Sequence, residues 1–206
     1  MKILTLEHIK GAMLRISFDN GEVINLDRDT ALTFGLCENR EISPDELKKV
    51  SAASQLARAK SRALWYLSRG DCSEKGMRRK LMHAGFDEAV CLEVVLTLVR
   101  LGLINDDAYA KRLAQNLAQR NYSSRQILAK LYEKQIPADI ARQAVQDTHI
   151  DAISAIEALI TKKYAARMKE KTKRQSVFAA LARKGFALED IKTVMRKFDD
   201  DFYYED

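Results

Sequence analysis

Proline, glycine and cysteine are scarce in this sequence, and long apolar runs are absent. Among 206 residues there are two prolines, eight glycines and three cysteines. No apolar stretch approaches the roughly 20 residues that a membrane-spanning helix needs, and the charged start of the chain does not resemble a signal peptide. The cysteines, Cys37, Cys72 and Cys91, are odd in number and widely spaced, which argues against a disulfide framework. We therefore expect a soluble, cytoplasmic protein that folds without disulfides.

Motifs for catalysis and metal binding are missing as well. The glycines form no phosphate-binding loop, no dinucleotide fingerprint and no nucleophile elbow. His8, His83 and His149 lie far apart, and Cys72 and Cys91 lack the closely spaced partners that zinc sites use. The sequence predicts no catalytic residues, no metal and no cofactor, so an enzyme is disfavoured.

Positive charge is present in excess and is unevenly distributed. The net charge is +6, and it would be +11 without the five acidic residues in positions 199–206. Residues 51–80 contain eight basic and two acidic groups, and residues 161–184 contain nine basic groups and one acidic group. This asymmetry favours a polyanion or an acidic protein as the partner, although a solvated surface is the alternative explanation.

The N-terminal fifty residues have a pattern of their own. Two runs of alternating apolar and polar residues, around 13–18 and 23–26, flank an Asn-Gly pair at positions 20 and 21. Such a pair is typical of a tight β-hairpin turn. A short helix is expected around 29–36. The sequence therefore predicts a small β-hairpin and helix extension.

Capping residues predict where the longer helices begin. Ser43, followed by Pro44 and then by Glu46 as a reciprocal partner, is typical of a helix start. Further N-caps are expected at Ser73, Asn105, Ser123, and Thr172 with Gln175.

From about residue 51 the sequence repeats itself at an offset of fifty residues. Apolar positions coincide three times, with spacings of 4, 5, 5 and 4 residues. The aligned positions are Met77, Ile127 and Val177; Leu81, Leu131 and Leu181; Phe86, Ile136 and Phe186; Cys91, Ala141 and Ile191; and Val95, Val145 and Met195. At the helix stop Gly85 and Gly185 align with Gln135, which is expected to lengthen its helix. A leading helix is predicted before each pair, at 51–67, 106–117 and 152–164.

These patterns predict a mainly α fold of three tandem three-helix repeats in an elongated, curved array, because stacked repeats bury their apolar faces against their neighbours. The expected parts are the extension at 1–50, repeats at 51–104, 105–150 and 151–198, and an acidic tail at 199–206. We expect the charged segment 164–175 to be a hinge. The tail is expected to be a disordered, solubilising end, with mimicry of DNA phosphates as the alternative.

Few aromatic residues are placed to stack on unpaired bases. Tyr122, Tyr132 and Tyr164 are candidates, but their helical spacing predicts partial burial equally well. Trp65, beside Leu64, is predicted to lie in the core. On the helix that carries Met77 inward, the arginines that follow should point outward.

Several short motifs are distinctive in combination. They are Ala63-Leu64-Trp65-Tyr66-Leu67-Ser68-Arg69, Ser73-Glu74, Arg79-Lys80-Leu81, Gly85-Phe86 and Leu103-Ile104-Asn105-Asp106-Asp107-Ala108-Tyr109-Ala110. Together they resemble the RecX family of regulatory proteins, over residues 50–198, and the N-terminal region resembles the extension of longer members. Gly76 and Met77 depart from the acidic residue and leucine usual in the family.

The resemblance implies a monomeric, non-enzymatic regulator of the RecA recombinase. It would lie in the groove of the RecA filament on single-stranded DNA and limit filament growth, ATPase and strand exchange. By the same resemblance, the residues that meet RecA or DNA would be Arg69, Arg78, Arg79, Lys111, Arg112, Arg120, Arg125, Lys162, Lys163, Arg167, Lys169, Lys171, Lys173 and Arg174. Two alternatives stay open: an autonomous DNA-binding protein with helix-turn-helix-like repeats, and a helical scaffold that binds no nucleic acid.

Overall fold

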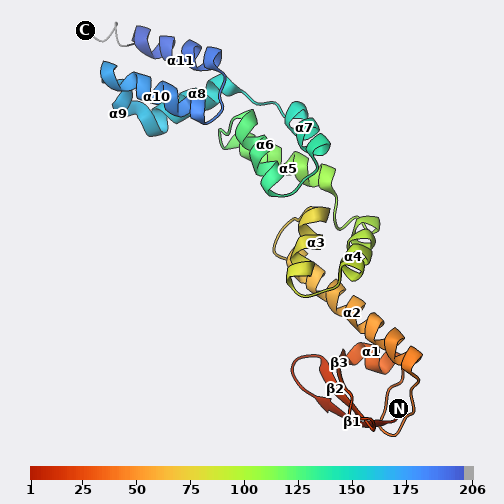
Figure 1. Cartoon of the computed structure of the whole chain (residues 1–206). Coiled ribbons are helices and arrows are strands. Elements are labelled where there is room, and N and C mark those ends of the chain that lie inside the picture. The colour runs from red at the N-terminus through yellow and green to blue at the C-terminus, as the bar shows by residue number, and fades with distance from the viewer. Residues whose placement is uncertain (202–206) are drawn as a thin grey trace. The chain divides into compact units, whose positions relative to one another are not determined.

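The computed structural model describes the backbone of residues 1–201 and the side chains of residues 1–198. It is mainly helical, with a small sheet at the N-terminus (Figure 1). The chain divides into two compact units. Unit 1 comprises residues 1–71 and 77–104, and unit 2 comprises residues 72–76 and those from 105 onward. The predicted acidic tail lies outside the residues whose side chains are described.

The sheet has three antiparallel strands in the order β1 (Ile3–His8), β2 (Met13–Phe18) and β3 (Val23–Asp27). The predicted hairpin is confirmed as β2 and β3, joined by a turn in which Gly21 has φ +81°. β1 was not predicted. Its pairing with β2 shifts register between Ile3 and Thr5, so alternation along β1 is irregular and gives a weak sequence signal.

The extension has its own core and is joined firmly to the helix that follows. Ile3, Ile16 and Phe18 are buried together with Val50. Asp27 caps α1 (Arg28–Thr33), which confirms the predicted short helix. The Ser54 hydroxyl donates to the Asp27 carboxylate at 2.6 Å. The extension is therefore held to α2 by a hydrogen bond as well as by apolar packing.

Helix α2 (Pro44–Leu67) is continuous across residue 50, where we expected the extension and the first repeat to meet. Ser43 is its N-cap, as predicted, and accepts the Glu46 N–H at 3.1 Å. The Glu46 carboxylate does not reciprocate but pairs with Arg40 at 2.5 Å. One long helix therefore serves both the extension and the first repeat.

The remaining helices follow the predicted three-helix plan. They are α3 (Glu74–His83), α4 (Glu88–Arg100), α5 (Asp106–Gln119), α6 (Ser124–Glu133), α7 (Ala138–Asp147), α8 (Ala152–Leu159), η1 (Ile160–Tyr164), α9 (Ala165–Met168), α10 (Lys171–Arg183) and α11 (Leu188–Asp201). The N-caps predicted at Ser73, Asn105 and Ser123 are confirmed. Among the described residues, no helix is long and apolar enough to cross a membrane.

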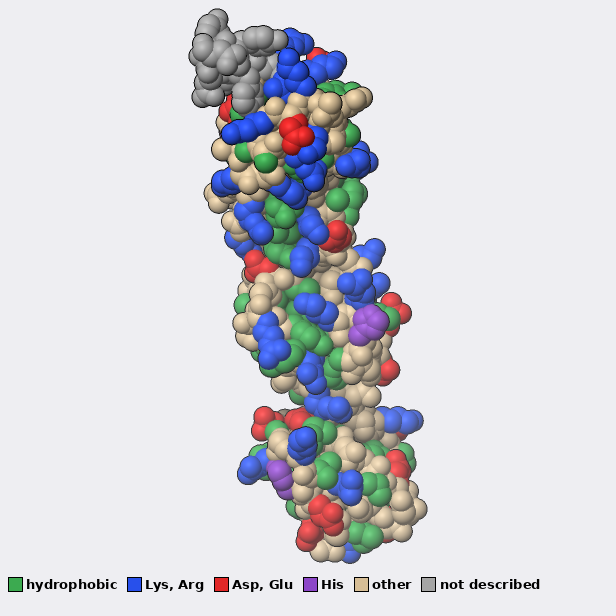
Figure 2. Space-filling view, turned by 90° about the vertical axis from the view of Figure 1, so that its left-hand side faces the viewer, with side chains coloured by type: hydrophobic (Ala, Val, Ile, Leu, Met, Phe, Trp, Pro, Cys, Tyr) green, Lys and Arg blue, Asp and Glu red, His purple; other side chains and the backbone are tan. Residues whose placement is uncertain are grey.

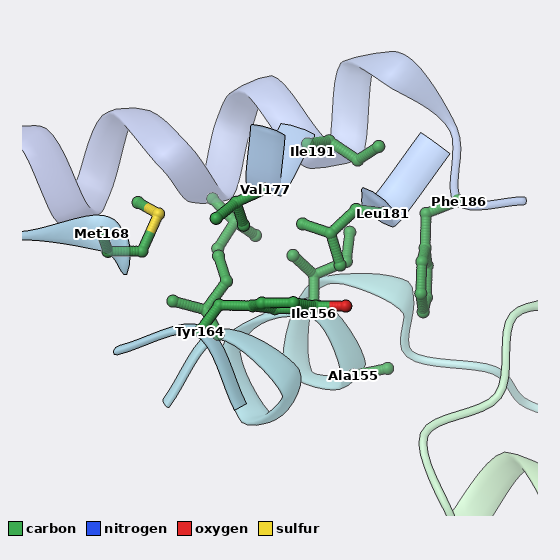
Figure 3. Packing of buried hydrophobic residues seen from close by; sticks show 10 residues of the cluster. Ala155, Ile156, Tyr164, Met168, Val177, Leu181, Phe186 and Ile191 are labelled. Carbon is green, nitrogen blue, oxygen red and sulfur yellow. The ribbon is translucent and has the colours of Figure 1, made fainter. Parts of the chain in front are cut away.

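Most of the residues that align at the fifty-residue offset in the sequence belong to the buried core. The first two aligned sets, which begin at Met77 and Leu81, are fully buried. In the third set Ile136 and Phe186 are buried, but Phe86 is only half-buried. Figure 3 shows how the third repeat encloses Val177 and Ile191. The last aligned set is displaced by one residue, because Val94, Ala144 and Val194 are more deeply buried than the residues that follow them.

The prediction that Gln135 lengthens its helix is wrong. Helix α6 ends at Glu133, and Gln135 takes the left-handed conformation at φ +60°, as Gly85 and Gly185 do at φ +87° and +86°. Burial of the next residue, Ile136, requires the chain to turn here. Tertiary packing therefore outweighs the preference of glutamine for a helical backbone.

The capping box predicted at Thr172 and Gln175 is also wrong. Helix α10 begins one residue before Thr172, with Glu170 at its N-cap and no side-chain cap bond. The leading helix of the third repeat contains the π-helical turn η1 within its predicted range, and it continues past its predicted end at 164 as the short helix α9, whose Met168 is buried. Segment 164–175 therefore contains core residues, and its role as a hinge stays a prediction.

Candidate nucleic-acid interface

The three cations predicted in the first repeat have different surroundings. Arg79 is exposed on α3. Arg78 is half-buried and lies 3.9 Å from the Glu88 carboxylate, so it faces α4 as well as solvent. The Arg69 guanidinium carbon lies 3.5 Å from the centre of the Trp65 ring. Only Arg79 of these three is a simple outward-pointing charge.

Trp65 is not a core residue, contrary to the prediction. It is 42% exposed, because the buried side of α2 is formed by the small residues Ala59 and Ala63. The neighbouring ring of Tyr66 meets Trp65 edge to face, with centroids 5.2 Å apart. The Arg62 guanidinium carbon lies 5.5 Å from the Trp65 centroid. The sequence neighbours of Trp65 are apolar, but the helix turns the ring away from the core.

A groove of about 670 Å³ lies beside Trp65 within unit 1. Its lining includes Met13 and Thr30 of the extension, Arg58 and Trp65 of α2, and Phe86 from the turn between α3 and α4. Its volume is in the range of sites that bind small ligands. Aromatic, aliphatic and cationic groups therefore converge on one concave surface.

The cations predicted in the second repeat lie on α5 and at its end. Lys111 and Arg112 are exposed on α5, and Arg120 follows the last residue of that helix. The Arg120 guanidinium carbon lies 5.7 Å from the centre of the half-buried Tyr122 ring. Of the other two tyrosines proposed for stacking, Tyr132 is 42% exposed, whereas Tyr164 is only 6% exposed and belongs to the core. Tyr164 is therefore excluded as a stacking surface.

Arg125 has a structural position in unit 2. Its side chain covers the backbone of Gly185, so closely that a methyl group added there would lie 2.7 Å from the Arg125 Cβ. Beside it, Ser123 donates a hydrogen bond to the Lys184 carbonyl at 2.6 Å. Arg125 thus packs where the second and third repeats meet, with its side chain still exposed at the surface.

The basic cluster of the third repeat separates into exposed and engaged cations. The exposed cations of η1, α9 and the turn that follows are Lys162, Lys163, Arg167 and Lys169. Lys173 pairs with Glu170 at 2.7 Å, and Arg174 Nε donates to the Met168 carbonyl at 2.7 Å. Lys171 is exposed on the first turn of α10. Arg174 therefore holds the α9–α10 turn in place and is only partly available to a partner.

The π-helical turn affects the placement of two of these lysines. In η1 the chain inserts an extra residue into the helix, which lets Ile160 and Tyr164 both face the core. Lys162 and Lys163 are thereby left together on the outer side. Figure 2 shows that lysine and arginine side chains outnumber acidic ones over the drawn face of unit 2.

The groups gathered at these surfaces are suited to binding. Guanidinium and ammonium groups contact phosphates, and exposed aromatic rings stack on bases. Within the described part of the chain, no three histidine, cysteine or acidic residues are grouped so that they could hold a metal ion. The fold and these surfaces define a helical repeat protein whose exposed helix faces carry cations.

Comparison with known proteins identifies the family. Two family models match, "RecX, first three-helix domain" over residues 59–98 and "RecX, second three-helix domain" over residues 105–145. The chain belongs to the RecX family. Curated relatives named regulatory protein RecX include one from Clostridioides difficile, 29% identical over 89% of this chain and 88% of that protein. Another, from Streptococcus uberis, is 26% identical over 94% of this chain and 76% of that protein.

Solved structures share the fold. A crystal structure titled regulatory protein RecX superposes with a TM-score of 0.67 at 23% identity, covering 94% of this chain and 98% of that one. The structure of RecX from Lactobacillus salivarius gives a TM-score of 0.63 at 24% identity, covering 71% and 98%. The predicted fold class of three-helix repeats with an N-terminal extension is thereby confirmed.

Proposed function

We propose that this protein is a non-enzymatic regulator of the RecA recombinase, acting on the filament that RecA forms with single-stranded DNA. It binds in the groove of the filament as a monomer and limits filament growth, ATP hydrolysis and strand exchange. The name shared by its relatives, regulatory protein RecX, supports the regulatory role. We expect it to act in the cytoplasm, in DNA repair and the SOS response.

The observation that carries this proposal is the separation of charge and core in unit 2. Each three-helix repeat encloses its own apolar cluster and leaves cations such as Lys111 and Lys162 on the outside. Such cations give attraction to a polyanion without any chemical step, and they raise the rate of encounter at low salt. A filament of protein on DNA presents phosphates and protein surface together.

The cations proposed as contacts differ in whether they can be replaced without disturbing the fold. Lys111, Lys162 and Lys169 are exposed, and replacing them disturbs no apolar packing. Arg125 and Arg174 contribute to the fold, so their loss would confound a binding test. The exposed lysines are therefore the appropriate residues to reverse.

The test is the single-stranded-DNA-dependent ATPase of the cognate RecA, titrated with this protein up to one copy per RecA. We expect suppression, and we expect the triple variant K162E/K163E/K169E to need roughly tenfold more protein for the same effect. The matched control is K10E/K48E/K49E, which changes the net charge equally at exposed lysines outside the proposed set.

Three outcomes separate the candidate functions. Equal loss of suppression in both triple variants would show that the effect depends on net charge and not on the particular lysines replaced. No suppression at any ratio contradicts the regulator. Binding to duplex DNA with sequence preference, and without an effect on RecA, would favour the autonomous DNA-binding protein instead.

A further inference from the structure

Trp65 is the single tryptophan of the chain and leaves 42% of its surface exposed. Tryptophan is highly buried on average, so this exposure needs an explanation. Arg69 lies against the ring at 3.5 Å, and Arg62 approaches it at 5.5 Å. The ring also lines the groove of unit 1. We call Trp65 with Arg62 and Arg69 the Trp65 platform.

We propose that the Trp65 platform binds an unpaired nucleotide of single-stranded DNA. The base stacks on the exposed part of the indole, and the neighbouring phosphates contact Arg62 and Arg69. Stacking on an aromatic ring requires an unpaired base and accepts any base, because every base has a π face. Two flanking arginines provide the charge that such a strand needs along its backbone.

The charged residues of unit 1 favour single-stranded DNA as the occupant and indicate where its phosphates would lie. Lys80 of α3 lies 5.3 Å from the centre of the Tyr66 ring, so the positive charge continues beyond the platform. The lining of the groove also includes Asp27 and Asp29. The Asp27 carboxylate keeps its charge and accepts hydrogen bonds from Thr30 and Ser54. Because phosphates are repelled by carboxylates, they would lie beside Arg62, Arg69 and Lys80.

This inference rests on the proposed function for the choice of single-stranded DNA as the occupant. The binding itself needs no recombinase, because the platform and the groove belong entirely to unit 1. The two proposals can therefore fail separately. Suppression of RecA without a nucleotide at Trp65 would overturn only the platform, and the reverse result would overturn only the regulator.

The test uses the intrinsic fluorescence of the full-length protein, in which Trp65 is the only tryptophan that can report. Titration with a short oligothymidylate in the absence of RecA is expected to quench the emission to a plateau, with weaker binding at higher salt. An unchanged emission while a labelled oligothymidylate binds by anisotropy would overturn the proposal. Equal quenching by a covalently closed circular duplex would do the same, because its bases are all paired and stacked within the helix and expose no face to the ring.

A pair of variants tests the stacking contact directly. We expect Trp65→Ala to weaken binding of the labelled oligothymidylate about tenfold, since one base stack contributes about 1–3 kcal/mol. Trp65→Phe should retain most of the affinity. Leu188→Ala is the matched control, because Leu188 is also a large exposed apolar side chain, at 52%, but it lies in unit 2 and has no π face. Equal losses in W65A and L188A, or a W65F variant as weak as W65A, would contradict stacking at Trp65.

Discussion

Ser123 joins two consecutive repeats through a single hydroxyl group. The hydroxyl donates to the carbonyl oxygen of Lys184 at 2.6 Å and accepts the backbone N–H of Gln126 at 3.2 Å. It therefore caps the start of α6 and satisfies the end of α10, where Lys184 is the C-cap. Fifty residues earlier in the chain, Ser73 makes the equivalent bond to the Lys134 carbonyl at 2.5 Å. Both of these residues belong to unit 2. The sequence repeat thus reproduces a junction as well as the helices.

Removing this hydroxyl should destabilise the protein by more than the loss of an ordinary cap. We expect Ser123→Ala to lower the free energy of unfolding by about 2 kcal/mol, because a helix cap and the partner of a carbonyl are lost together. Urea unfolding followed by circular dichroism measures the change. Ser124→Ala, at the exposed first residue of the same helix, is the control and should change stability by less than about 0.5 kcal/mol. Similar values for the two variants would contradict the double role of Ser123.

Substitutions at two glycines in equivalent positions allow the energetic cost of backbone strain to be separated from that of a steric clash. Gly85 and Gly185 have φ of +87° and +86°, but a Cβ at Gly85 would meet nothing within 4 Å, whereas one at Gly185 would lie 2.7 Å from Arg125 Cβ. We expect Gly85→Ala to cost about 1–2 kcal/mol from the left-handed backbone alone. Gly185→Ala should cost at least about 1 kcal/mol more, because the backbone of Arg125 must also shift.

Thermal and urea unfolding of the two glycine variants provide the comparison. Because both glycines precede a buried or half-buried phenylalanine in the same kind of turn, the difference isolates the contact with Arg125. If both variants lost the same stability, the close contact between Arg125 and Gly185 would contribute nothing to the change in the free energy of unfolding.

The repeated core could be predicted from the sequence because each apolar position occurs three times. Any one helix has an ambiguous boundary, but Met77, Ile127 and Val177 support one another through a shared offset, and all three are fully buried. Local capping chemistry was equally informative at Ser123, where the predicted N-cap is confirmed and Gln126 completes a capping box that was not predicted.

The candidate site was harder to predict because it depends on which way each helix faces. Trp65 follows apolar neighbours in sequence, yet the buried side of α2 is taken by the smaller Ala59 and Ala63. Arg125 and Arg174 look like solvent-facing cations in sequence, but Arg125 packs on the distant Gly185 and Arg174 donates to the Met168 carbonyl across the α9–α10 turn. Charge identifies candidate binding residues, whereas the tertiary contacts decide which of them are available.

Gln135 is a position where the chain can be stabilised. Its φ of +60° is costly for a residue with a Cβ, and its buried side-chain oxygen Oε1 has no hydrogen-bond partner in the described structure. Gln135→Gly removes both costs and restores the residue type found at the equivalent Gly85 and Gly185. We expect the free energy of unfolding to rise by about 1–2 kcal/mol.

Asn121→Gly is the comparison for this stabilisation. Asn121 has nearly the same φ, +61°, but asparagine tolerates the left-handed region better than glutamine does. Its replacement should therefore give a smaller gain in the same urea experiment. A destabilised Gln135→Gly variant would show instead that the glutamine side chain contributes packing that outweighs its strain.

The carboxyl group of Asp106 should make stability depend on pH in the acidic range. Asp106 is only 5% exposed, and this burial raises the pKa of its carboxyl group above the ordinary value of 3.8, although the N–H of Glu74, at 3.0 Å, opposes the shift. The folded protein then binds a proton more tightly here than the unfolded chain does. Between 3.8 and the raised pKa, the contribution of Asp106 to stability therefore falls as the pH rises.

Asp106→Asn keeps an oxygen that can accept the Glu74 N–H but carries no charge to bury. Its stability relative to the unmodified protein should be greatest near neutral pH and should decline as the pH is lowered towards 3.8, where the native carboxyl group becomes protonated. Urea unfolding at several pH values measures this difference. Ser124→Ala, which removes no titratable group, is the control and should change stability equally at each pH. A stability difference for Asp106→Asn that is constant across this range would mean that burial of the charge at the start of α5 carries no net cost.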